Sequence, residues 1–210
     1  MLPLVYPITD TTISGLSHAD QVALLGDAGA TFVQLREKHL PAVDFYNEAK
    51  TALSIAAEKG VTVIVNDRVD IALALNARGV HLGQDDLPPE AARKLLGNEA
   101  IIGYSTHNLD QAIAAANLPV DYVAIGPIFE TGTKSNPDPV VGLDGLRAVR
   151  AAIGDKSLVA IGGITATNAR EVIEAGANSV ALISSLLSGG SAGISDRYRT
   201  FVKLLTRRQT

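Results

Sequence analysis

Two cations in this chain stand where they could bind a phosphate-bearing ligand. Arg36 and Lys38 alternate with Leu35 and Glu37, so both cations point to the same side of an extended segment. An arginine fork grips two phosphate oxygens and a lysine adds a mobile point charge, which is a pairing suited to a diphosphate. The alternative is a salt bridge to Glu37 or Asp67 at the rim of the site.

Two aspartates, Asp67 and Asp86, each end an apolar run and lie nineteen positions apart. If the two runs are adjacent parallel strands, their carboxyl ends bring both carboxylates to one rim. Carboxylates beside phosphates favour a hard divalent cation, most simply Mg²⁺. The alternative role is N-capping of the helices that follow, and Asp85 is an ambiguous neighbour.

A third group could bind a phosphate through its backbone. Gly162-Gly163 ends one β-branched run and Ser184-Ser185 ends the next. In a barrel, the glycines would free backbone N–H groups and the serines would start a turn beside them, which together form a phosphate cradle. Taken alone, a Gly-Gly pair more often makes only a tight turn.

Two histidines lie close to these residues. His81 is inside an apolar run, where a hydrogen-bonded core residue is a simpler interpretation than a catalyst. His107 follows Ser105-Thr106, where it could cap a helix or join the site. No Ser-His-Asp order or Cys-His pair predicts covalent catalysis, and no His/Cys cluster predicts zinc.

Apolar runs that alternate with helical patterns position these residues, and the alternation predicts a parallel sheet. The eight predicted strands are Leu4–Thr9, Thr31–Leu35, Val61–Val65, Gly79–Leu82, Ala100–Tyr104, Tyr122–Pro127, Leu158–Ile164 and Ser179–Ile183. The predicted helices are Ala19–Gly29, Pro41–Lys59, Val69–Asn76, Pro88–Leu96, Leu109–Asn117, Leu143–Ile153, Asn168–Ala175 and Ser195–Arg208. Eight such units favour a (β/α)₈ TIM barrel over a doubly wound sheet, and we expect residues 1–210 to form a single domain.

The overall composition narrows the partners. Of the 210 residues, 47% are hydrophobic and only 4% aromatic, so Ala, Val, Ile and Leu must build the core. A formal net charge of −4 provides no basic face for nucleic acid or an anionic membrane. The chain has no cysteine, no leader pattern and no long apolar stretch, so we expect a cytoplasmic protein. The sequence leaves the oligomeric state open, a homo-oligomer included.

Several motifs, in the same order, resemble the signatures of the thiamine-phosphate synthase family, also called thiamine-phosphate pyrophosphorylase. They are Gln34-Leu35-Arg36-Glu37-Lys38, Asn66-Asp67-Arg68, Gly79-Val80-His81-Leu82-Gly83-Gln84-Asp85-Asp86, Gly126-Pro127-Ile128-Phe129, Thr131-Gly132-Thr133-Lys134 and Ile161-Gly162-Gly163-Ile164. Each motif is weak alone, but the set covers nearly the whole chain. The resemblance implies a Mg²⁺-dependent transferase that joins hydroxymethylpyrimidine diphosphate to the carboxylate form of a thiazole phosphate, giving thiamine phosphate and pyrophosphate.

The resemblance also implies roles for individual residues. Those implied for the diphosphate are Gln34, Arg36, Lys38, Asn66, Ser105 and Lys134; for the thiazole phosphate Thr131, Thr133, Gly163, Ile183 and Ser184; and for Mg²⁺ Asp67 and Asp86. Leu35, Glu37 and Gly132 belong to the same motifs and are expected to bind substrate. The candidate catalytic residues are Arg36, Lys38, Lys134 and Ser105, since cations would stabilise charge growing on the leaving pyrophosphate. The thiazole nitrogen needs no general base.

One motif departs from the family pattern. Glu130 stands where the family often carries a small residue or proline, and Phe-Glu-Thr also occurs in related thiazole tautomerases of the same fold. The first alternative is therefore such an isomerase. Asp67, Asp86 and the cation pair argue against it, because a monophosphate needs neither a metal pair nor a second anion site. The second alternative is a non-catalytic barrel that binds thiamine phosphates.

The segment Glu130–Val141, which follows the sixth predicted strand, is long for such a connection, where about 2–6 residues is usual. We expect it to close over the site, so that Lys134 meets the leaving pyrophosphate where water is excluded. Lys134→Ala should then lower kcat and kcat/KM together, with little change in the dissociation constant of the diphosphate. Steady-state kinetics checks this, and a variant that only raised KM would show a uniform substrate anchor.

Overall fold

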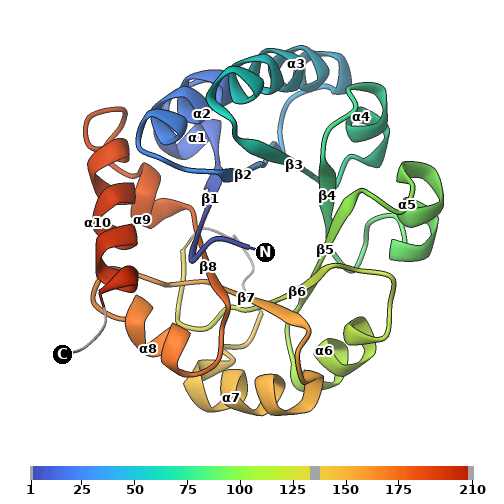
Figure 1. Ribbon diagram of the computed structural model, residues 1–210, viewed down its shortest axis with the longest axis vertical. Helices are drawn as coiled ribbons and strands as arrows, with labels where there is room; N and C mark the ends of the chain where they lie inside the picture. The colour runs from blue at the N-terminus through green and yellow to red at the C-terminus, as the bar shows by residue number, and fades with distance from the viewer. Residues whose placement is uncertain (1, 133–137, 208–210) are drawn as a thin grey trace.

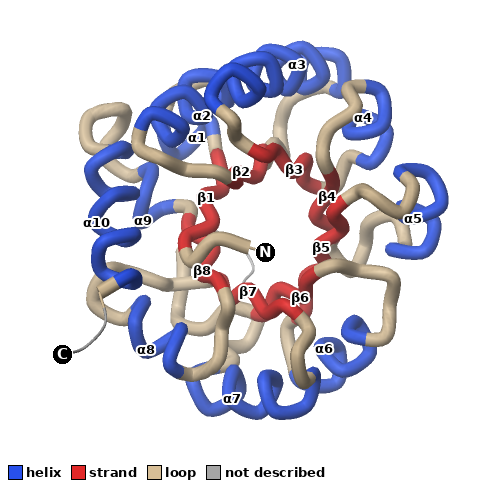
Figure 2. The backbone as a smooth tube through the Cα atoms, in the orientation of Figure 1, coloured by secondary structure: helices blue, strands red, loops and turns tan. Residues whose placement is uncertain are grey.

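The structure is a computed structural model that describes residues 2–132 and 138–207. Its eight strands are parallel and pair in chain order, and β8 pairs with β1, so the sheet closes into a barrel. Figures 1 and 2 show the ring of strands at the centre and the helices outside it. The predicted (β/α)₈ fold is confirmed.

All eight predicted strands are present. The strands are β1 (Val5–Thr9), β2 (Phe32–Leu35), β3 (Thr62–Asn66), β4 (Gly79–Leu82), β5 (Ile101–Thr106), β6 (Tyr122–Ile125), β7 (Ser157–Ile161) and β8 (Ser179–Leu182). Nearly every residue in them is buried. This burial on both faces explains why the strands are continuous apolar runs rather than alternating ones.

The eight predicted helices are confirmed with small shifts at their ends. The helices of the described residues are α1 (Thr11–Ser14), α2 (His18–Asp27), α3 (Ala42–Lys59), α4 (Val69–Ala74), α5 (Pro89–Leu96), α6 (Leu109–Ala116), α7 (Gly142–Ile153), α8 (Ala169–Glu174), α9 (Ser184–Leu187) and α10 (Ile194–Thr206). Helices α1 and α9 were not predicted, because four residues are too few to show a 3.6-residue period. Ser184 therefore begins a short helix, where only a turn was expected.

Alternate strand residues form two separate apolar layers. Val33, Leu35 and Val65 belong to the larger layer, which lies between the strands and the helices. Tyr6, Ile64 and other inward residues form a second cluster that fills the barrel. In Figure 1 the segment that leads into β1 crosses the barrel axis, and its Leu2 packs against this inner cluster.

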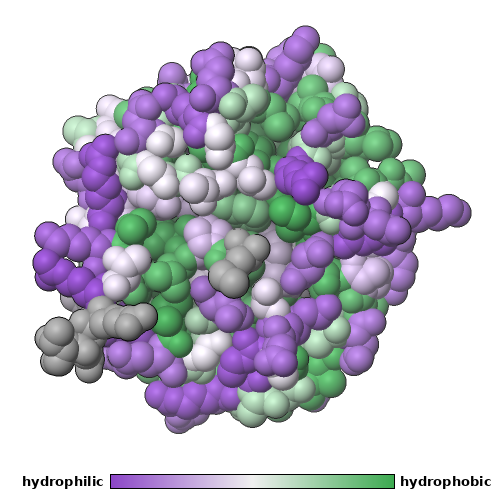
Figure 3. Space-filling model, viewed as in Figure 1, coloured by the Kyte–Doolittle hydropathy of each residue, from purple (hydrophilic) through white to green (hydrophobic). Residues whose placement is uncertain are grey.

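The face seen in Figure 3 carries hydrophilic side chains around much of its rim, with hydrophobic side chains mostly inside that rim. None of the helices in the described parts of the chain has the length and apolar character needed to cross a membrane.

Gly103 in β5 makes room for Tyr122, one of the two tyrosines inside the barrel. A Cβ atom on Gly103 would lie 2.0 Å from Cζ of Tyr122, its register partner in β6. Gly103→Ala should therefore overpack the barrel and lower the free energy of unfolding by about 3 kcal/mol. Urea denaturation measures this.

The control for Gly103→Ala is Gly132→Ala, because no atom of the described residues lies within 4 Å of a Cβ at Gly132. It should change the free energy of unfolding by less than about 0.5 kcal/mol. Equal losses in the two variants would contradict the packing argument.

Candidate active site

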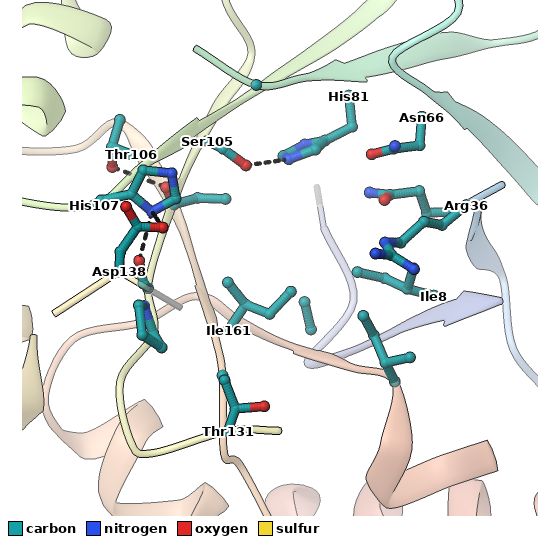
Figure 4. A pocket seen from close by; sticks show the side chains of 18 of the residues that line it. Ile8, Arg36, Asn66, His81, Ser105, Thr106, His107, Thr131, Asp138 and Ile161 are labelled. Atoms are coloured by element: carbon teal, nitrogen blue, oxygen red, sulfur yellow. Dashed lines mark hydrogen bonds and ion pairs between the residues drawn. The ribbon is translucent and has the colours of Figure 1, made fainter. Parts of the chain in front are cut away.

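A cavity of about 520 Å³ lies at the carboxyl-terminal ends of the strands. Its lining runs from Ile8 in β1 to Ser184 and Ser185 after β8. Figure 4 shows the labelled residues converging on this cavity from several strands and loops. The predicted site residues that line it are Gln34, Arg36, Lys38, Asn66, Asp67, Asp86, Ser105, Thr131, Gly163, Ile183 and Ser184.

Three predicted residues that the structure describes, Leu35, Glu37 and Gly132, are not among those that line the cavity. Leu35 is fully buried in the layer between the strands and the helices. Glu37 and Gly132 also lie outside the lining. Thr133 and Lys134 lie outside the described residues, so their predicted roles stay predictions.

Glu37 shapes the loop after β2. Its carboxylate accepts hydrogen bonds from the backbone N–H groups of Lys38 at 2.7 Å, His39 at 2.6 Å and Leu40 at 3.2 Å. Burial alone would raise the pKa of Glu37, but the N–H groups of His39 and Leu40 and the buried His18 together lower it. The side chain therefore orients the loop that carries Lys38.

The two cations that follow β2 each have a carboxylate partner. Arg36 Nη1 donates to Asp10 Oδ2 at 2.5 Å, and Lys38 donates to Asp67. The ion pair with Asp67 is the one that the sequence offered as an alternative for Lys38. Asp10 was missed, although it directly follows β1 and so ends a strand as the other site residues do. Since arginine has five N–H donors and lysine has three, both cations keep donors for a ligand.

Asp67 and Asp86 crowd two carboxylates at the ends of β3 and β4. Burial raises the pKa of Asp86, and the neighbouring Asp67 carboxylate raises it further. Helices α4 and α5 begin without a side-chain cap, so neither aspartate serves as the predicted alternative N-cap. Asp67 also has φ +62°, which is a costly backbone conformation for a residue with a Cβ.

This donor set fits a hard divalent cation, because the oxygens are anionic and a cation would relieve their repulsion. The described residues contain no cluster of three or more His, Cys, Asp or Glu side chains arranged for a metal. Mg²⁺ nevertheless commonly binds to only two protein carboxylates, and phosphate and water oxygens then fill its other coordination positions.

Two residues that line the cavity after β7 and β8, Gly163 and Ser184, have backbone N–H groups available. Gly163 has φ +63°, and a Cβ on it would lie 2.5 Å from the carbonyl oxygen of Glu130. Among the described residues, the N–H groups of Gly163 and Ser184 have no hydrogen-bond acceptor. Free N–H groups beside a cavity are suited to bind a phosphate.

His81 is both a core residue and a cavity residue. It is buried, as predicted, and its Nε2 lies 2.8 Å from the Ser105 hydroxyl oxygen (Figure 4). Burial lowers the pKa of His81 to about 4, so the ring is neutral at pH 7. Sequence reasoning missed this contact, because strand periodicity does not show what a buried polar side chain meets.

Asn66 and His107 also line the cavity. The buried Asn66 Nδ2 has no hydrogen-bond partner among the described residues, which leaves a donor beside the cavity. His107 Nδ1 lies 2.8 Å from the Gly126 carbonyl oxygen. The cap of α6 is Asn108, so His107 lines the site and does not cap the helix.

Active sites of (β/α)₈ barrels lie at the end of the strands where this cavity is found. The fold and this cavity thus define a (β/α)₈ barrel with a candidate active site at its mouth.

Comparison with known proteins narrows this class. A family model described as thiamine monophosphate synthase matches residues 5–186. A thiamine-phosphate synthase from Koribacter versatilis (strain Ellin345) is 49% identical over 193 residues, covering 89% of this chain and 90% of that protein. The thiamine phosphate pyrophosphorylase structure from Pyrococcus furiosus has a TM-score of 0.82 at 35% identity, covering 96% of this chain and 94% of that chain. The chain belongs to the thiamine monophosphate synthase family, so the protein is a transferase, as the resemblance implied.

The raised pKa of Asp86 predicts a pH-dependent cost in stability. The folded protein holds this proton more tightly than the unfolded chain, so the wild type loses stability as pH rises through the Asp86 pKa. Asp86→Asn keeps an oxygen for the Gly83 N–H group and removes the charge. Without added metal at pH 7, it should raise Tm by about 1–2 °C, a small value because solvent screens this carboxyl.

The Tm advantage of Asp86→Asn should disappear as pH falls and the wild-type carboxyl is protonated. Differential scanning calorimetry across this range measures it. Asp85→Asn removes the same charge from an exposed neighbour and should give a smaller effect. An equal rise in both variants would point to net charge instead of crowding.

Proposed function

We propose that the enzyme transfers the pyrimidinylmethyl group of hydroxymethylpyrimidine diphosphate to the nitrogen of a thiazole phosphate in its carboxylate form. The bond from the methylene carbon to the diphosphate breaks as the bond to the thiazole nitrogen forms. The products are thiamine phosphate, pyrophosphate and CO₂, because the thiazole carboxylate leaves and its ring carbon takes up a proton. The main support is that one cavity has two arrangements suited to phosphate, at different places around the barrel mouth. Arg36 and Lys38 follow β2, whereas the free N–H groups of Gly163 and Ser184 follow β7 and β8.

The diphosphate is proposed to lie on the arc of β2 to β5. Arg36 and Lys38 bind its phosphate oxygens, and the unpartnered Asn66 amide donates to the same substrate. Gln34 and Ser105 complete the contacts, and Lys134 is proposed as a further cation. Asp67 and Asp86 would hold Mg²⁺, which when bound would neutralise charge on the diphosphate.

The thiazole phosphate is proposed to lie on the arc of β6 to β8. The N–H groups of Gly163 and Ser184 bind its phosphate, while Ile183 provides apolar contact with the ring. Thr131, and Thr133 from the adjoining segment, are proposed as further contacts. This placement directs the thiazole nitrogen at the pyrimidine methylene carbon, so orientation supplies much of the rate enhancement.

The proposed catalysis is electrostatic. As the bond to pyrophosphate breaks, negative charge grows on the leaving group beside Arg36 and Lys38, and their fixed positions stabilise that charge. Each cation is already oriented in the free protein by its carboxylate partner, Asp10 or Asp67. The attacking nitrogen carries no proton, so His81 and His107 need not act as bases.

The direct test supplies both substrates and Mg²⁺ to the purified protein. Release of pyrophosphate and formation of thiamine phosphate are expected, and Asp67→Ala or Asp86→Ala should abolish Mg²⁺-dependent turnover. Metal-independent isomerisation of the thiazole phosphate alone would instead indicate the tautomerase. Binding without turnover would indicate a non-catalytic barrel.

The two phosphate sites should respond separately to mutation. Gly163→Ala crowds the Glu130 carbonyl and should raise KM for the thiazole phosphate about tenfold, with KM for the diphosphate little changed. Gly60→Ala is the control, because Gly60 has a similar φ of +66° at the end of α3 but no neighbour within 4 Å of a Cβ. Equal changes in both Michaelis constants of Gly163→Ala would contradict the separate thiazole site.

A further inference from the structure

A chain of hydrogen-bonded side chains crosses the interior of the barrel below the cavity. Gln34 Nε2 lies 2.9 Å from the Tyr6 hydroxyl, which lies 2.8 Å from the Tyr122 hydroxyl. The Tyr122 hydroxyl lies 3.0 Å from His81 Nδ1, and His81 Nε2 lies 2.8 Å from the Ser105 hydroxyl. Gln34 and Ser105, the two ends of this chain, both line the cavity.

The donors and acceptors of these side chains allow the hydrogen bonds to run in one direction, from Gln34 to Ser105. The Gln34 amide nitrogen can only donate, so the Tyr6 oxygen accepts. The Tyr6 hydroxyl then donates to Tyr122, and the Tyr122 hydroxyl donates to His81 Nδ1. A neutral ring that accepts at Nδ1 carries its proton on Nε2 and donates it to Ser105.

The opposite direction leaves a buried group unsatisfied. If Tyr122 donated to Tyr6, the Tyr6 oxygen would accept twice and its own hydrogen would have no acceptor among the described residues. Tyr6 is only 1% exposed, and an unpaired buried hydroxyl costs about 1–3 kcal/mol. The direction from Gln34 to Ser105 gives Tyr6, Tyr122 and His81 a partner for every donor and acceptor in the series, and it is therefore favoured.

The rings in the chain are held by packing as well as by hydrogen bonds. Tyr6 meets Phe32 edge to face with ring centroids 4.8 Å apart. The His81 ring stacks on Tyr122 with centroids 5.6 Å apart and planes 19° apart. Because these rings cannot turn freely, the hydrogen-bond direction is built into the barrel.

We propose that Tyr6, Tyr122 and His81 are positioning residues. Their hydrogen bonds determine which end of the substrate site offers an acceptor and which end offers a donor, and we call this arrangement the polarity of the site. They leave the Gln34 side-chain amide oxygen, Oε1, free as an acceptor and the Ser105 hydroxyl hydrogen free as a donor. The site then favours a ligand with an N–H group toward Gln34 and an oxygen or ring-nitrogen acceptor toward Ser105. The kinetic part of this inference rests on the proposed function, in which Gln34 and Ser105 contact the pyrimidine diphosphate.

Two phenylalanine variants separate the two ends of the chain, because each removes one hydroxyl and keeps the ring. Tyr122→Phe removes the hydrogen bond to His81 Nδ1. Nothing then favours the Nε2–H tautomer of His81, and the hydrogen bond from His81 to Ser105 is weakened. Tyr6→Phe removes the acceptor of the Gln34 side-chain amide, so that this amide can rotate by 180°. The hydrogen bonds from Tyr122 through His81 to Ser105 stay in place. Tyr198→Phe, on α10 outside the barrel, controls for the loss of a buried phenol.

The imidazole ¹⁵N spectrum of the ligand-free protein should show the Nε2–H tautomer of His81 in the wild type. Tyr122→Phe should change the His81 signals, whereas Tyr6→Phe and Tyr198→Phe should not. Each of the two barrel variants should lower kcat/KM for the pyrimidine diphosphate about tenfold, and KM for the thiazole phosphate should stay within about twofold. Tyr198→Phe should keep wild-type kinetics.

Two results would overturn the inference. One is an Nδ1–H tautomer of His81 in the wild type, and the other is a Tyr122→Phe variant with unchanged ¹⁵N signals and unchanged kinetic constants. An inactive wild type would refute the proposed reaction instead, since the ¹⁵N spectrum needs no substrate and still decides the polarity. Melting curves confirm that each variant is folded.

Discussion

Pairing of β8 with β1 is the constraint on which the whole site depends. An open parallel sheet would spread its strand ends along a line, whereas closure brings all eight carboxyl ends around one mouth. Residues far apart in the chain, such as Gln34 and Ser105, therefore line the same 520 Å³ cavity. The helices complete the fold by covering the outer apolar layer, which leaves the barrel mouth for polar residues.

Charge pairing at this mouth prepares it for an anionic ligand. Arg36 is held by Asp10, and Lys38 by Asp67, so the two cations are oriented before a ligand arrives. Asp86 has the Gly83 N–H group as hydrogen-bond donor and Asp67 as a like-charged neighbour, and its raised pKa reflects burial and that neighbour. A divalent cation would relieve this repulsion, which links the proposed metal to the same residues that orient Lys38.

Polar side chains inside a barrel are costly unless each is satisfied. Tyr6 and Tyr122 meet this condition through each other and through the cavity residues at either end of their chain. Gly103 provides the space that Tyr122 needs, which connects interior packing to the cavity above. The proposed polarity of the site is thus a property of the core as well as of the rim.

The sequence by itself determined the barrel and most of its mouth, because strand burial and strand ends are local features; Gly79–Leu82 was predicted with both ends correct. Tertiary structure alone decided which groups meet. It turned Glu37 onto its own loop, paired Arg36 with Asp10 and joined His81 to Ser105. Local periodicity carries no information about such partners. Asp10 and Ser105 come from neighbouring strands, and the Glu37 contacts depend on how its own loop folds, so only strand pairing and loop conformation set these distances.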